Sequence, residues 1–326
     1  MMGDDDRRFS AHRAGFPAGA AFPSQDRGKA STLEEFGTAR GNPAGTSRTR
    51  ASPARWPRPR KAAPPVSETD IQVLLDDGPE AFNAWRDAHP DEKLDLGGMD
   101  LSARDLRGVN LAGARLTKAD LGGSDLSGAI LDDITAEGAD FSGARMHAAS
   151  LQRAHLVNAN LKGANLAGAS LQDAALHMAD LSTAYLVGAN LAGAVLSGAC
   201  LNLANVAHAQ LDQAHLNHAT MAHANLWGAS VQFAHLEGVD LSHSNMVGAS
   251  LVGTNLDGSD LSDADLQAAA LGQASLRGAD VRGASFVGAE LAGSDFILAQ
   301  TEGADFRHAG TEGTHFEAPG IEDVEW

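Results

Sequence analysis

A repeat of five residues runs from Leu94 to Phe316 without a single shift of register. Steps of five from Leu96 to Ile321 give 46 central positions, of which 31 are Leu, and Ala stands two residues before the centre in 33 of them. Only Ala136, Thr301 and Thr311 replace a large apolar residue at the centre. A period this short over more than two hundred residues is typical of a solenoid and excludes most globular folds.

The order of residues within each unit predicts a very short strand followed by a corner. A small apolar, a polar and a large apolar residue alternate, which is the period of an extended strand. The last two residues must turn the chain, and Gly fills the final position in 23 of the 45 units from Gly98 to Ala318. Gly suits such a corner because it adopts positive φ readily. A helix is excluded, because apolar residues spaced five apart would not stay on one face of it.

The repeated motif Ala-(Asp/Asn)-Leu-x-Gly resembles that of the pentapeptide-repeat proteins, and one clean copy is Ala164-Asn165-Leu166-Ala167-Gly168. The resemblance covers residues 94–318. It implies an all-β fold, a right-handed quadrilateral β-helix with four units, or twenty residues, in each coil. On that geometry we expect about eleven coils in a rod roughly 50 Å long, at ~4.8 Å between coils.

The N-terminal arm, residues 1–66, differs from the rest in charge. It holds 12 Lys/Arg and 6 Asp/Glu, whereas the other 260 residues hold 12 and 36. Its Pro-rich and Arg-rich composition without an apolar period predicts a disordered segment. A flexible contact for acidic surfaces, a secretion address for a bacterial effector, and a tail without a specific role all remain open for it.

Residues 67–93 predict two short helices that cap the first coil. Ser67 begins a sequence resembling a capping box, and Gly78-Pro79 separates the two helices. A charged residue, Arg104, takes an inward position in the first coil and is expected to pair with Asp76 or Asp77. The alternative to a cap is that this segment supplies a recognition helix for a partner. The short segment that often precedes the repeats in the family is matched by Phe82, Asn83, Trp85 and Arg86.

At the C-terminal end no matching helix is predicted, and the central residues become larger. Steps of twenty place Phe286 on Phe306 and Phe296 on Phe316. The tail, residues 319–326, is expected to close this end by folding back. Otherwise this end would be a dimerisation surface.

Outward residues twenty apart should form columns, and one column is strongly acidic. Rods of this family that protect DNA gyrase resemble B-DNA in width and charge, so the column suggests mimicry of DNA at a topoisomerase. Those rods usually carry loops and a C-terminal dimerisation helix, which this sequence lacks. The alternative is that Asp serves solubility and corner hydrogen bonds. The column contains Asp100, Asp120, Asp140, Asp180, Asp240, Asp260 and Asp280.

A second column is apolar in the position after each centre. Ala207 belongs to it and Gln267 interrupts it. Large exposed apolar patches mark contact sites, so we expect a protein partner or a second copy to bind here, with Trp227 at the centre. Scattered surface residues are the alternative. The column comprises Val187, Trp227, Val247 and Val287.

No arrangement typical of catalysis occurs in the sequence, so we expect no enzyme and no cofactor. His215 should stack on His235 and His223 on His243, but neither pair has a third converging metal ligand. With one cysteine, Cys200, and no secretory or transmembrane segment, a cytoplasmic location is expected. The leading hypothesis is a non-enzymatic protein-interaction scaffold without direct binding of nucleic acid by the rod. The second hypothesis is the DNA-mimicking inhibitor or protector.

Overall fold

A computed structural model describes residues 68–317 of the 326-residue chain. They belong to one compact unit, Ala62–Trp326. The predictions made for residues 1–66, for Ser67 and for the tail 319–326 lie outside the described residues. No helix among residues 68–317 is both long and apolar enough to cross a membrane.

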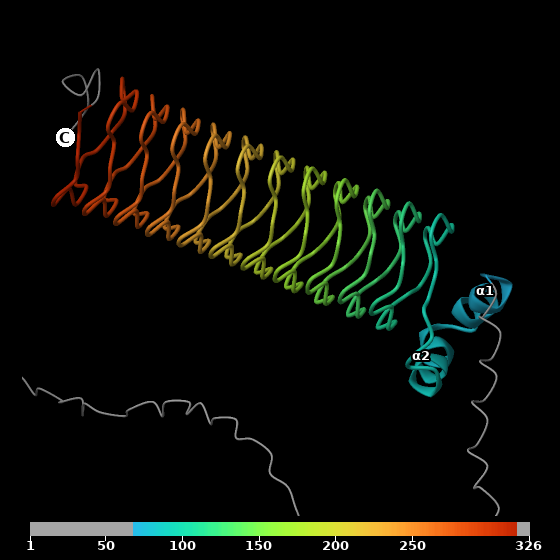
Figure 1. Cartoon of the computed structure of the whole chain (residues 1–326). Coiled ribbons are helices and arrows are strands. Elements are labelled where there is room, and N and C mark those ends of the chain that lie inside the picture. Colours follow the sequence, from blue (N-terminus) through green and yellow to red (C-terminus); the bar gives the residue numbers. More distant parts are fainter. Residues whose placement is uncertain (1–67, 318–326) are drawn as a thin grey trace, which may run out of the picture. The chain divides into compact units, whose positions relative to one another are not determined.

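Two short helices precede the repeat, in the segment where the sequence predicts them (Figure 1). Helix α1 spans Glu68–Asp76 and α2 spans Pro79–Ala88. Between them Gly78 has a φ of 97°, a conformation that L side chains rarely adopt. Pro79 then begins α2, where its missing N–H costs no hydrogen bond.

The repeat forms stacked coils in which residues twenty apart are paired. Parallel bridges run from Asp95↔Arg115 to Asp295↔His315, so four five-residue units complete each coil. One residue per unit makes the bridge, and within residues 68–317 the repeat contains isolated bridges rather than extended strands. Figure 1 shows the coils stacked along a nearly straight axis with their corners aligned.

Each corner is a tight turn that follows the central residue. At one corner the Ala119 N–H donates to the Leu116 carbonyl at 2.9 Å, and Lys118 has a φ of 58°. Positive φ at the third residue of a four-residue turn is the geometry of a type II turn. The same position has positive φ in the units with Gly and in those without it. The prediction that Gly is frequent there because it adopts positive φ readily is therefore confirmed.

The core is a column of central residues flanked by the alanines two positions earlier. Leu176 and Leu196 are fully buried, as is Ala194. Because each coil contacts only its neighbours, stability is built from coil-to-coil contacts. The predicted ring stacks are confirmed: Phe286 lies 4.8 Å from Phe306, and Phe296 lies 5.1 Å from Phe316, between ring centroids.

The helices satisfy backbone groups of the first coil that have no coil beneath them. Asn83 of α2 accepts from the Asn110 N–H at 2.8 Å and donates to the Gly108 carbonyl at 2.8 Å. Arg86 donates to the Ala112 carbonyl at 2.9 Å. Phe82 is fully buried in the same core as the first coil. Asn83 and Arg86, the polar residues of the short segment that often precedes the repeats in the family, thus each have defined partners in the first coil.

The inward charge of the first coil is also paired as the sequence predicts. Arg104 Nη1 lies 2.7 Å from Asp76 Oδ1 at the end of α1. The Arg104 side chain is 26% exposed, so its charge is partly shielded from solvent and benefits from a near carboxylate.

Candidate protein-interaction face

One side of the coil stack carries the central residues Leu106 to Phe306 in steps of twenty. At each level the bridge residue before the centre and the turn residue after it lie at the surface of this side, except for the buried turn residue Ala207. Between Arg145 and Asp265, bridge and turn positions contain no Asp, Glu, Lys or Arg. We call this side the neutral face. Its uncharged bridge residues are Asn165, Tyr185, Asn205, Asn225 and Asn245, and its uncharged turn residues are Ala167, Val187, Ala207, Trp227 and Val247.

Three large apolar side chains are exposed on three successive coils at the middle of the neutral face. Tyr185 is 46% exposed and Trp227 is 49% exposed. Leu203, 62% exposed, lies at the corner that leads into the face. The other exposed large apolar residues of the repeat lie on other columns, so this cluster is the densest on the described coils. The exposed large apolar residues on other columns are Ile130, Met178, Phe233 and Leu298.

The apolar column predicted from the sequence is narrower in the structure. Trp227 is exposed, but Val187, Val247 and Val287 are only half-buried surface residues and Ala207 is almost fully buried. The residues do stack, since successive coils are joined by backbone bonds such as His208 N–H to the Trp227 carbonyl at 3.0 Å. The valines therefore form the floor of the face and Trp227 projects from it.

A ladder of asparagine side chains runs beside this column. Asn225 donates to Asn205 at 3.1 Å, and Asn245 donates to Asn225 at 3.1 Å. Each oxygen also accepts from the backbone N–H two residues later, as Asn225 does from Trp227 at 3.2 Å. The amides are thereby held in one orientation, which keeps this part of the surface rigid and flat.

His208 partly covers Trp227 from the neighbouring corner. The two rings meet edge to face with centroids 4.5 Å apart. The imidazole leans over Gly228, where a Cβ atom would lie 2.8 Å from Nδ1. Gly228 therefore leaves the space in which His208 supports the indole ring.

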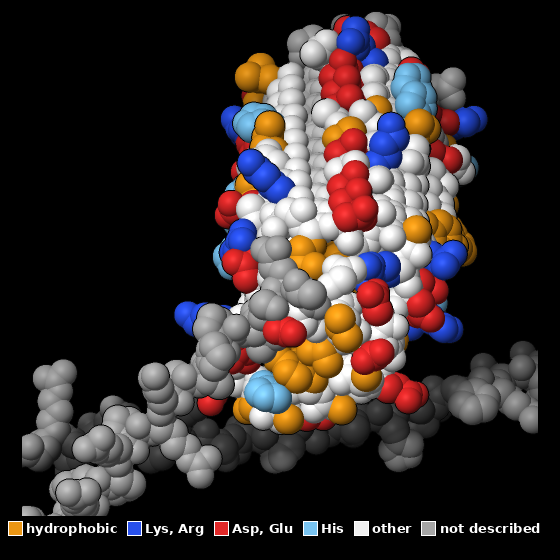
Figure 2. Space-filling model, turned by 90° about the vertical axis from the view of Figure 1, so that its right-hand side faces the viewer, with side chains coloured by type: hydrophobic (Ala, Val, Ile, Leu, Met, Phe, Trp, Pro, Cys, Tyr) orange, Lys and Arg blue, Asp and Glu red, His pale blue; other side chains and the backbone are white. Residues whose placement is uncertain are grey.

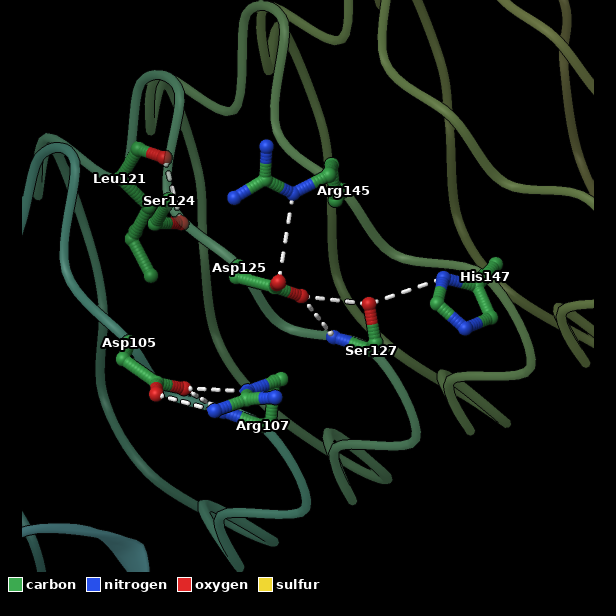
Figure 3. Close-up of polar contacts among 8 residues, drawn as sticks. All are labelled: Asp105, Arg107, Leu121, Ser124, Asp125, Ser127, Arg145 and His147. Carbon is green, nitrogen blue, oxygen red and sulfur yellow. Dashed lines mark hydrogen bonds and ion pairs between the residues drawn. The ribbon is translucent and has the colours of Figure 1, made fainter.

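Charged residues return at both ends of the neutral face. At the N-terminal end Arg145 Nε lies 3.2 Å from Asp125, which also accepts from the Ser127 hydroxyl (Figure 3). On the coil below, Arg107 forms a two-pronged pair with Asp105 and lowers the pKa of that carboxyl to about 2, with help from the Arg107 N–H. At the other end Arg307 pairs with Asp305 in the same manner.

The predicted acidic column is present on the side that precedes the neutral face. Members twenty residues apart are bridged, for example Asp240↔Asp260 and Asp260↔Asp280, and Asn160, Cys200 and Thr220 interrupt the column. Every Asp of the column accepts the backbone N–H two residues later, at 2.8–3.1 Å. Corner hydrogen bonds are thus a structural reason for Asp at these positions. Hydrogen bonds from Arg282 also lower the pKa of Asp280.

The middle of the repeat has no permanent positive charge. Between Lys162 and Arg277 the sequence contains nine Asp/Glu, seven His and no Lys or Arg. Charged side chains of both signs are visible in Figure 2, which faces the helical end.

The histidine stacks predicted from the sequence are found: His215 on His235 at 4.7 Å and His223 on His243 at 4.8 Å between ring centroids. Within residues 68–317, no three His, Cys, Asp or Glu side chains are grouped to hold a metal ion.

The family model described as pentapeptide repeats matches this sequence in eight copies between residues 95 and 310. The chain belongs to the pentapeptide repeat family. Proteins of this family form right-handed quadrilateral β-helices and are in general non-enzymatic structural or interaction proteins. No curated protein matches the sequence.

Solved structures similar to this pentapeptide repeat protein include HetL from Nostoc sp. strain PCC 7120, a protein involved in heterocyst differentiation regulation. HetL is 26% identical, with 74% of this chain and 96% of HetL covered and a TM-score of 0.40. The protein alr5209 from Nostoc PCC 7120 is 32% identical over 34% of this chain and 83% of its own, with a TM-score of 0.25. QnrB1, a plasmid-mediated fluoroquinolone resistance protein, is 15% identical over 71% and 93%, with a TM-score of 0.31. The family assignment rests on the repeat model.

Sequence reasoning missed Tyr185 and Leu203 of this pentapeptide repeat protein because, on this side of the coils, it followed only the position after each centre. Stepping by twenty through the bridge and final positions as well would have placed both beside Trp227. The run of levels without charge from Asn165 to Val247 was a second available signal.

Proposed function

We propose that this chain is a non-enzymatic scaffold that binds protein through the neutral face. In this proposal about eleven coils form a rigid rod, and α1 and α2 cap its first coil. The contact would centre on Trp227, with the half-buried Val187, Val247 and Val287 as its floor. A rod without a cleft suits recognition by a flat surface better than chemistry on a small molecule.

The observation that supports this proposal is the contrast in charge between the neutral face and the rest of the chain. The whole chain carries a net charge of −18. Yet Tyr185, Leu203 and Trp227 share three successive coils in a region without charge. Aromatic residues are enriched and charges depleted at the centres of protein interfaces. Because the asparagine ladder already fixes the surface, little side-chain ordering would be needed on binding.

Affinity purification from the native cell tests the scaffold, with the full chain as bait. We expect a protein that is retained by the wild type and lost with Trp227→Asp, because a carboxylate would be desolvated at the centre of the contact. Met178→Asp is the matched control, since Met178 is 64% exposed on another column. The retained protein is then purified and titrated against each variant by calorimetry. Equal affinity for wild type and Trp227→Asp would refute the neutral face as the binding surface.

A second candidate is mimicry of DNA by the acidic column. The observation in its favour is the 114-residue stretch without Lys or Arg, which contains Asp180, Asp240 and Asp260. Of these, Asp240 and Asp260 lie on adjacent coils, about 4.8 Å apart, and would present their charge to a cationic groove. A supercoiling assay with purified DNA gyrase tests this function. Neither inhibition nor protection from a quinolone at a large excess of the protein would remove it.

A further inference from the structure

We propose that the neutral face binds a proline-rich segment of its protein partner, in the polyproline II conformation, across Tyr185, Asn205 and Trp227. This inference rests on the proposed function, because it names the class of partner that the same face takes. Proline has an apolar ring and no backbone N–H, but its carbonyl oxygen still accepts hydrogen bonds. Such a segment presents acceptors and apolar rings with few donors, and the neutral face presents the complementary set.

The amide oxygens of the asparagine ladder are already occupied. Asn205 Oδ1 accepts from the Ala207 N–H at 3.2 Å and from Asn225 Nδ2 at 3.1 Å. Asn225 Oδ1 accepts from the Trp227 N–H at 3.2 Å and from Asn245 Nδ2 at 3.1 Å. An amide oxygen has two lone pairs, so neither oxygen has an acceptor site left for a partner.

Donors, in contrast, remain unused at the middle of the face. Within residues 68–317, neither Nδ2 of Asn205 nor Nε1 of Trp227 has a hydrogen-bond partner. Asn225 and Asn245 each give one amide hydrogen to the ladder and keep a second. A partner that brings many N–H groups would bury some of them without acceptors, which is costly. The carbonyl oxygens of a proline-rich segment would instead meet the unused donors.

Apolar side chains surround these donors on three successive coils. Tyr185 lies one coil before Asn205, and Trp227 lies one coil after it. Leu203 is exposed at the corner that leads to Asn205, and the small, buried Ala207 follows it. Aromatic residues that line a shallow surface are the usual platform for proline-rich segments, which lose little entropy on binding because their backbone is already extended.

The separation of the two aromatic residues fits a short segment. Tyr185 and Trp227 lie two coil spacings apart, ~9.6 Å along the stack, and two positions apart across the face, ~6.6 Å in extended backbone. The resulting distance of roughly 12 Å is spanned by about four residues of polyproline II, which rises ~3.1 Å per residue. A segment that runs obliquely from one ring to the other passes between Asn205 and Ala207. One of its carbonyl oxygens can therefore accept from Asn205.

The lack of charge on the neutral face favours this partner over an acidic or a basic one. Between Arg145 and Asp265 the bridge and turn positions contain no Asp, Glu, Lys or Arg. A charged segment would lose hydration there without gaining an opposite charge. A run of prolines carries no charge and has none to desolvate.

Calorimetric titration of the full chain with an acetylated and amidated peptide of ten prolines tests the inference. The peptide is added to about 2 mM, so that millimolar affinity is measurable. We expect saturable binding of this decaproline and none of a Gly-Ser peptide of equal length, which has N–H groups and a flexible backbone. Trp227→Ala and Tyr185→Ala should each weaken binding by about tenfold or more. Met178→Ala, at an exposed residue of another column, should leave it within about twofold.

Asn205→Asp tests the donors with the least change in shape. The carboxylate keeps the oxygen that accepts from the Ala207 N–H and from Asn225, but it loses both hydrogens of Nδ2. We expect binding of decaproline to weaken by about tenfold or more. Asn165→Asp is the matched control, because it adds the same charge to the same column and its Oδ1 likewise accepts from the Ala167 N–H, at 3.1 Å. It should change the affinity by less than about threefold, since the added charge lies two coils away and is screened by salt.

Circular dichroism confirms that each variant is folded. Equal binding of decaproline by wild type and Asn205→Asp would overturn the inference, as would equal binding of the Gly-Ser peptide. Self-association of the chain that is lost with Trp227→Ala, without binding of decaproline, would show a second copy on this face instead. A chain that retains another protein through Trp227 but binds no decaproline would refute the inference and leave the scaffold. A chain that does neither would refute both.

Discussion

Replacing Asn83 should loosen the first coil while leaving the middle of the repeat unchanged. The amide of Asn83 makes two hydrogen bonds, one with the Asn110 N–H and one with the Gly108 carbonyl, both at 2.8 Å. On later coils the equivalent N–H is paired with the coil below, as the Ile130 N–H is with the Val109 carbonyl. Asn83→Leu would leave a half-buried donor without its partner.

The magnitude follows from those two contacts. A hydrogen bond contributes a net ~1 kcal/mol, and an orphaned buried donor costs ~1–3 kcal/mol, so we expect the first coil to lose about 2 kcal/mol of local stability. At 1.4 kcal/mol per factor of ten, the Asn110 amide should exchange with solvent deuterium about 30-fold faster. Because coils interact with their nearest neighbours, amides near Leu196 should exchange at the wild-type rate.

Hydrogen–deuterium exchange resolved by mass spectrometry measures both regions in one experiment. Gln210→Ala is the control, since Gln210 is an exposed bridge residue far from α2. Unchanged exchange of the Asn110 amide in Asn83→Leu would refute the role of α2 in completing the first coil. Uniformly faster exchange along the whole repeat would refute the nearest-neighbour account.

Three further predictions concern the core, a corner and an ion pair. Leu176→Ala, at a fully buried centre, should lower the free energy of unfolding by about 2–5 kcal/mol in urea, and a loss below about 1 kcal/mol would contradict the packed column. Gly228→Ala should lower the melting temperature because φ is 62° and the new Cβ would meet His208, and His208→Ala should recover part of the loss; no recovery would contradict the contact. The pKa of Asp105 is about 2 in the folded chain, below its unfolded value, so the Arg107 pair contributes stability above pH ~4 that is lost as pH falls through about 2. The difference in unfolding free energy between wild type and Arg107→Ala should therefore shrink from pH 5 to pH 2, and a constant difference would contradict this reasoning.

The five-residue period was sufficient to predict the local structure because it assigns every residue a direction. Inward Ala and Leu, an outward polar residue and a corner with positive φ follow from the pattern alone, and Lys118 at 58° shows that the corner does not depend on Gly. The period does not determine how many units close a coil. The twenty-residue spacing came from the family resemblance, and the bridge Asp95↔Arg115 agrees with it.

Side-chain contacts between elements were less predictable. Pairing of Arg104 with Asp76 could be expected, because an inward charge near a helix end requires a counter-charge. The hydrogen bonds of Asn83 and Arg86 could not, since they depend on how α2 is oriented against the first coil. The exposure of Trp227 beside half-buried valines depends on how far each side chain extends beyond the backbone, which a pattern of apolar residues does not encode.

Oxidative footprinting of the neutral face tests the central claim most directly. Hydroxyl radicals label exposed side chains, and Trp227 at 49% and Met178 at 64% exposure are both accessible on the single chain. Labelling is compared between dilute purified protein and the complex isolated under native conditions. The account predicts that Trp227 and Tyr185 become protected in the complex while Met178 is labelled equally in both samples. Equal labelling of Trp227 in the two samples would contradict the claim that this face binds protein.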